Sequence, residues 1–99
     1  MKTFKDLTFE PHPLGGKHAY IRFDNKRAVS VVTGGDCFHI SEFAPYEVGF
    51  IKLDHKLGCV YLERGTESVT IAEDADHNDV QGYCTEDEVT LIMKAIQKL

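Results

Sequence analysis

The sequence predicts an α+β domain in which an antiparallel meander of four to six strands packs against one C-terminal helix. Several short stretches between residues 17 and 62 alternate apolar with polar residues, which is typical of half-buried strands. Residues 86–98 instead repeat apolar residues at spacings of three and four, the period of a helix. The chain has 99 residues, enough for one domain with one core, so we expect a single domain spanning residues 1–99.

The N-terminal part is expected to supply three strands. Residues 7–9 alternate and predict a short first strand, after which prolines and glycines at 11–16 break the pattern. Residues 17–23 alternate cleanly and residues 27–33 are rich in valine, so both favour strands. The polar turn between them makes the pair a hairpin.

The middle of the chain predicts a second hairpin. Residues 37–45 are ambiguous, because Pro45 limits them to an edge strand or an ordered loop. Residues 46–53 carry apolar side chains at both odd and even positions, and therefore on both faces of a strand, which favours a central strand. Residues 57–62 follow a polar turn and are expected to pair back onto that strand.

The C-terminal part is expected to hold the helix. Val69 and Ile71 indicate a weak strand, and the acidic residues 73–79 indicate a solvated loop. Thr85 and Glu88 have the spacing of a capping box, and carboxylates in the first turn favour the positive end of the helix dipole. We therefore predict a helix over residues 86–98.

Composition predicts a cytoplasmic protein. The N-terminus carries charges where a signal peptide needs an apolar run, and the apolar runs are too short to span a membrane, so we expect no membrane partner. Three widely spaced cysteines favour free thiols in a reducing compartment over a disulfide framework.

Charge is placed unevenly along the chain. The formal net charge is −5, and residues 57–88 hold nine acids against a single base, Arg64. This sign is opposite to that of a nucleic-acid-binding surface, so we expect no direct nucleic-acid binding. A negative surface suits a basic protein partner, a cation, or solubility alone. The candidate contact residues in this acidic stretch are Glu63, Glu67, Glu73, Asp74, Asp76 and Asp79.

Two aromatic residues in the irregular stretch are further candidates for partner binding. Phe43 and Tyr46 flank Pro45 and could form an exposed interaction patch. The commoner alternative is that both anchor the loop to the core.

Metal and thiol chemistry provide the alternative hypotheses. Asp74, Asp76 and Asn78 resemble the start of a calcium loop, but Asp79 and Thr85 stand where an EF-hand needs glycine and glutamate. A small metal-binding or thiol-dependent enzyme could use Cys37, His39 and Cys59, with Cys84 or His77 in reserve, although the paired spacing of a structural zinc site is absent. With no serine elbow or phosphate-binding loop either, we predict no catalytic residue, metal or cofactor.

Three parts of the chain resemble small uncharacterised accessory proteins of tailed bacteriophages and prophages. They are Phe4 to Pro13 with its Pro-His-Pro ending, Ala28 to Gly34, and Asp79 to Val89 together with Ile96 to Leu99. The resemblance implies a meander leading into an acidic turn and a capped helix, and expression in a bacterial host.

Accessory phage proteins of this size often bind and inhibit a host or defence protein, with anti-CRISPR and other anti-defence proteins as a subset. Because fold does not give function, this remains an expectation. The leading hypothesis is a non-enzymatic protein that binds and modulates a bacterial protein. A self-associating structural protein, such as a homodimer formed by edge strands, is the third alternative.

Overall fold

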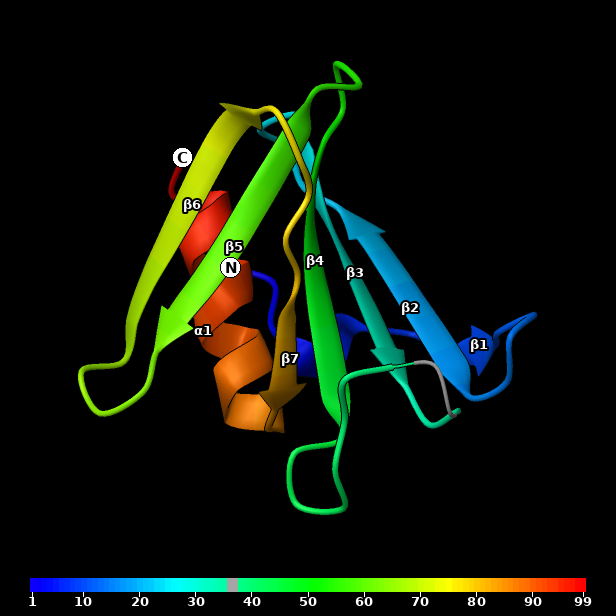
Figure 1. Cartoon of the computed structure of the whole chain (residues 1–99). Helices are drawn as coiled ribbons and strands as arrows, with labels where there is room; N and C mark the ends of the chain where they lie inside the picture. Colours follow the sequence, from blue (N-terminus) through cyan, green and yellow to red (C-terminus); the bar gives the residue numbers. More distant parts are fainter. Residues whose placement is uncertain (36–37) are drawn as a thin grey trace.

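The computed structural model describes residues 1–35 and 38–99 and confirms the α+β class (Figure 1). It contains seven strands, one short 3-10 turn and one α-helix within those residues. In chain order the elements are η1 (Phe4–Asp6), β1 (Glu10–Pro11), β2 (Lys17–Arg22), β3 (Arg27–Thr33), β4 (Tyr46–Lys52), β5 (Leu57–Glu63), β6 (Ser68–Ala75), β7 (Gln81–Cys84) and α1 (Glu86–Gln97).

The strands form two sheets. A five-stranded antiparallel sheet has the order β1-β2-β3-β4-β7, and β5 pairs with β6 in a separate two-stranded sheet. Strands β1 to β4 therefore form the predicted meander. Strand β4 pairs with a neighbour on each side, as its apolar residues on both faces predicted.

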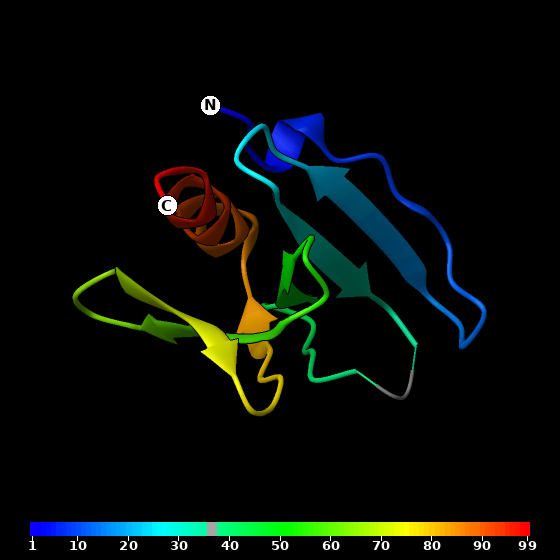
Figure 2. The same ribbon diagram turned by 90° about the horizontal axis from the view of Figure 1, so that it is seen from above.

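The core lies where α1 meets both sheets. Figure 2 shows α1 between the five-stranded sheet and the β5–β6 hairpin. The helix buries one face completely, and it packs there on side chains of β3, β4 and β5. The fully buried helix residues are Val89, Ile92, Met93 and Ile96, and the strand residues around them include Val29, Val31, Val48, Phe50 and Val60.

The capping box predicted at the start of the helix is present. The Glu88 backbone N–H donates to Thr85 Oγ1 at 3.2 Å, and the Thr85 backbone N–H donates to Glu88 Oε1 at 2.9 Å. The helix ends at Gln97, one residue before the predicted boundary. Over residues 1–35 and 38–99, no helix is both long and apolar enough to cross a membrane.

The first predicted strand, at residues 7–9, is wrong. The chain instead makes a 3-10 turn at Phe4–Asp6, because the Thr3 backbone N–H donates to the Asp6 carboxylate at 2.8 Å. Leu7 and Phe9 follow the turn and pack against the core without pairing as a strand. Their alternation reflects this packing, and the first strand begins at Glu10.

The second predicted hairpin is also wrong, because β5 leaves β4 and pairs with β6. The Phe50 ring packs directly on the backbone of Gly58, so β5 crosses over the core face of β4 instead of lying beside it. Pairing with β5 then extends β6 to Ala75, so residues 73–75, expected in a loop, are strand. Residues 38–45, in contrast, form the ordered loop that was one of the two alternatives.

We predict that Gly58→Ala destabilises the fold. A Cβ at this position would lie 2.5 Å from Phe50 Cδ2, so the ring or strand β5 must shift, at a cost of about 1–3 kcal/mol. Chemical denaturation measures the change in the free energy of unfolding. Gly49→Ala is the matched control, since its Cβ would meet Val80 Cγ1 at an ordinary 3.5 Å. Equal stability of the two variants would contradict this account of the crossing.

Candidate functional site

One end of the molecule combines exposed aromatic rings with carboxylates. The loop 38–45, the end of β7 and the start of α1 all lie at this end (Figure 1). We call it the bulge surface and define it by five exposed residues: His39, Phe43, Tyr83, Glu86 and Asp87.

Tyr83 owes its position to a β-bulge between β4 and β7. Tyr46 faces Cys84 and Val48 faces Gln81, so two residues of β7 oppose one residue of β4. Tyr83 sits in the left-handed region with φ 55°, and the residue is 50% exposed. This conformation is rare and costly for a bulky residue, and it persists only where the surroundings enforce it.

Contacts on both sides enforce the bulge. The Tyr83 backbone N–H donates to the His39 carbonyl at 2.8 Å. The Arg64 guanidinium donates to the carbonyls of Gly82 and Tyr83, and its Nε pairs with Glu88 at 2.9 Å. A Cβ on Gly82 would lie 2.6 Å from His39 Cβ, so the loop packs tightly on the bulge. The backbone at Tyr83 is thereby fixed, and the Tyr83 ring centroid lies 6.4 Å from that of His39.

Phe43 is an exposed apolar residue of the loop 38–45. It is 86% exposed, the largest fraction among the large apolar residues that the structure describes. It lines a shallow cavity of 370 Å³ together with Pro45, Tyr46, Thr85, Glu86 and Asp87. Of the two alternatives for Phe43, the structure therefore places it at the surface and not in the core.

Tyr46, the second aromatic candidate, packs against other aromatic rings of the fold. Its ring packs on Phe4 at 5.0 Å and on Phe9 at 5.9 Å between centroids. Burial raises the pKa of the Tyr46 hydroxyl, and the negative charge of Glu86 adds to the effect. Tyr46 also lines the cavity that Phe43 lines.

The six acidic candidates do not form one patch. Glu63 and Glu67 lie exposed at the β5–β6 turn. Glu73 pairs with Arg27 at 2.5 Å, and Asp74 pairs with Lys52 at 2.9 Å. The hydrogen bond from Lys52 lowers the pKa of the Asp74 carboxyl. Glu73 and Asp74 are thus paired with bases of the larger sheet, and Asp76 and Asp79 contact His77 in the segment after β6.

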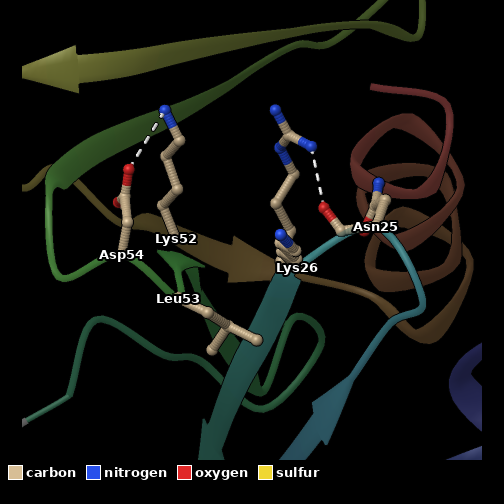
Figure 3. Close-up of a pocket in the computed structure, with 6 residues that line it drawn as sticks. Asn25, Lys26, Lys52, Leu53 and Asp54 are labelled. Atoms are coloured by element: carbon tan, nitrogen blue, oxygen red, sulfur yellow. Dashed lines mark hydrogen bonds and ion pairs between the residues drawn. The ribbon is translucent and has the colours of Figure 1, made fainter.

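The basic partners of these ion pairs, Arg27 and Lys52, line a pocket of 260 Å³ together with Asn25, Lys26, Leu53 and Asp54 (Figure 3). In it Lys52 points toward Asp54 at 3.7 Å, and the Arg27 guanidinium donates to the Asn25 carbonyl at 2.9 Å. Because Arg27 and Lys52 also bind acids of β6, this pocket joins β6 to the larger sheet. Its cationic groups are engaged in that structural role.

Two residues of the thiol hypothesis, His39 and Cys59, lie within the described part of the chain. Cys37 lies outside the described residues, and His39 contacts Glu47 at 3.1 Å. Cys59 is buried on β5 beside His77, which was held in reserve, and Asp79; one donor atom from each of the three lies within 4.8 Å of the others.

Neither the Cys84 thiol nor the calcium candidates are arranged for the chemistry considered for them. Burial raises the pKa of the Cys84 thiol to about 12, so this thiol is a poor nucleophile. The calcium candidates Asp74, Asp76 and Asn78 bind Lys52, His77 and the Gly58 backbone N–H, respectively. Each of the three oxygens is thus occupied by a different donor.

The importance of Tyr83 was not visible in the sequence. The sequence gives no sign of a bulge at Gly82 either, because that bulge depends on contacts with residues 39 and 64. Comparison with known proteins adds no assignment: the chain matches no protein-family model, no curated protein and no solved structure.

We predict that Tyr83→Gly is more stable than Tyr83→Ala by about 1 kcal/mol. Both variants lose the ring, but only glycine adopts the left-handed conformation without a Cβ penalty. The same pair at Tyr20, an exposed position of β2, is the control and should show the opposite order, since glycine weakens a regular strand. Thermal unfolding of the four variants tests this. An alanine variant at 83 that equals the glycine variant would show that the backbone there is not strained.

Proposed function

We propose that this chain is a non-enzymatic accessory protein of the phage or prophage type, which binds and modulates or inhibits a bacterial host or defence protein in the cytoplasm. The observation that carries the proposal is the exposed Phe43 ring, which shares a shallow cavity with Glu86 and Asp87 at the end of the molecule where β7 ends (Figure 1). The Phe43 ring is 86% exposed, so covering it with a partner surface would lower the free energy of the complex.

The fixed bulge supports binding energetically. Binding a partner costs conformational entropy for each side chain that becomes immobilised. The hydrogen bonds from Arg64 and to His39 already fix the backbone at Tyr83, so part of that cost is met during folding. Aromatic residues held in this way are typical of interface hot spots.

The carboxylates determine the chemistry of the partner. Glu86 and Asp87 are exposed at the N-terminus of α1, and Glu42 precedes Phe43. A complementary partner surface would have an apolar pocket for Phe43, rimmed by lysine or arginine. The same charges disfavour a nucleic-acid backbone as the ligand.

The test is an affinity capture from bacterial lysate with tagged protein, followed by binding measurements with the purified captured protein. We expect one dominant bacterial protein that is released as the salt concentration rises. Phe43→Ala should weaken its binding at least tenfold, because truncating a hot-spot aromatic costs about 2 kcal/mol or more. Tyr20→Ala removes an exposed ring from β2 and should leave binding unchanged.

Two results would contradict the proposal. The first is a captured protein that binds wild type and the Phe43→Ala variant equally well. The second is a chain that captures nothing and forms a dimer by light scattering, because a second copy would then occupy the surface. Glu86→Lys with Asp87→Lys distinguishes the acidic contribution, since it should remove most of the salt dependence.

A further inference from the structure

The segment that follows β6 runs back along β5 and is fixed there by its backbone. Cys59 and Asp79 form a parallel bridge, and the Val60 backbone N–H donates to the Asp79 carbonyl at 3.2 Å. The Gly58 backbone N–H donates to Asn78 Oδ1 at 3.0 Å. The Cys59 thiol itself donates to the His77 carbonyl at 3.3 Å. Residues 77–79 are therefore held against the buried thiol.

This arrangement collects three different metal-ligating groups. The Cys59 sulfur, a His77 ring nitrogen and an Asp79 carboxylate oxygen all lie within 4.8 Å of one another. His77 Nε2 and Asp79 Oδ2 are 3.3 Å apart. Bond lengths of about 2.0–2.3 Å place two ligands of a tetrahedral zinc ion roughly 3.3–3.6 Å apart. The histidine and aspartate already match this spacing, and a small movement completes the site.

Neighbouring side chains orient these ligands. His77 Nδ1 contacts Asp76 Oδ1 at 2.6 Å, which leaves Nε2 facing Asp79. A carboxylate on the second ring nitrogen is the usual support of a zinc-bound histidine. The Tyr61 hydroxyl donates to Asp79 Oδ2 at 2.7 Å and fixes the carboxylate in the same way.

The electrostatics of the cluster favour a cation. The His77 ring lies between two carboxylates, with Nδ1 2.6 Å from Asp76 Oδ1 and Nε2 3.3 Å from Asp79 Oδ2. A metal ion would bind a deprotonated Nε2 of His77, and it would displace the thiol proton of Cys59. Its affinity should therefore increase as the pH rises.

We propose that Cys59, His77 and Asp79 bind one zinc ion, with Asp76 and Tyr61 as supporting residues. A thiolate, an imidazole and a carboxylate together suit zinc, whereas calcium and magnesium prefer oxygen ligands alone. The side chains of His77 and Asp79 are 57% and 48% exposed, so a fourth coordination position faces solvent and can hold water or an external ligand. The zinc proposal stands independently of the bulge surface, whose residues lie in other segments of the chain.

The test uses the full chain, stripped with a chelator and titrated with Co²⁺ and then Zn²⁺. We expect one equivalent of cobalt with a thiolate charge-transfer absorption, displaced by one equivalent of zinc. His77→Ala and Asp79→Ala should each weaken binding at least tenfold, and both residues are exposed enough for the variants to fold. Asp76→Asn should weaken it less and shift the pH dependence.

Control variants assign the thiolate. Cys59→Ser should abolish the absorption, and its fold is checked by circular dichroism. Cys37→Ser, Cys84→Ser and His39→Ala should each keep one equivalent. The proposal is overturned if the folded wild-type chain gives no charge-transfer absorption, or if that absorption survives in both His77→Ala and Asp79→Ala.

Discussion

The burial of one face of α1 between two sheets is the interaction on which the rest of the structure depends. Val89, Ile92, Met93 and Ile96 are completely buried. Burying side chains of this size contributes about 1.5–3 kcal/mol each, so the four together are comparable to the net stability of a small domain. The five-stranded sheet covers only part of this face. The β5–β6 hairpin must cover the remainder, which explains why β5 leaves the meander after β4.

That departure has consequences for both proposed sites. Once β5 lies over the core, its edge is open to the segment after β6, and residues 76–79 settle beside Cys59. The chain then returns to pair with β4 through β7. The mismatch between β4 and β7 is absorbed by the bulge at Gly82 and Tyr83. The grouping of Cys59, His77 and Asp79 and the bulge surface therefore both follow from the crossing of β5 over β4.

The acidic segment shows how tertiary contacts change the meaning of charge. In the sequence, residues 57–88 form an acidic stretch with a single base. In the fold, Glu73 and Asp74 meet Arg27 and Lys52, which come from the distant strands β3 and β4. The exposed carboxylates next to an apolar ring are instead Glu86 and Asp87, whose first role is to stabilise the start of the helix.

Local physics in the sequence determined the helix, its capping box and strands β2 to β4, because side-chain periodicity and capping act within a few residues. Only the tertiary structure decided the partner of β5, the bulge at Tyr83 and the grouping of Cys59 with His77. Each depends on contacts between different elements of the fold, such as Phe50 on Gly58, Arg64 on Tyr83 and Cys59 on His77. No periodicity records such contacts: a glycine at 58 or 82 has the same appearance in a sequence whether a ring, a loop or solvent lies beside it.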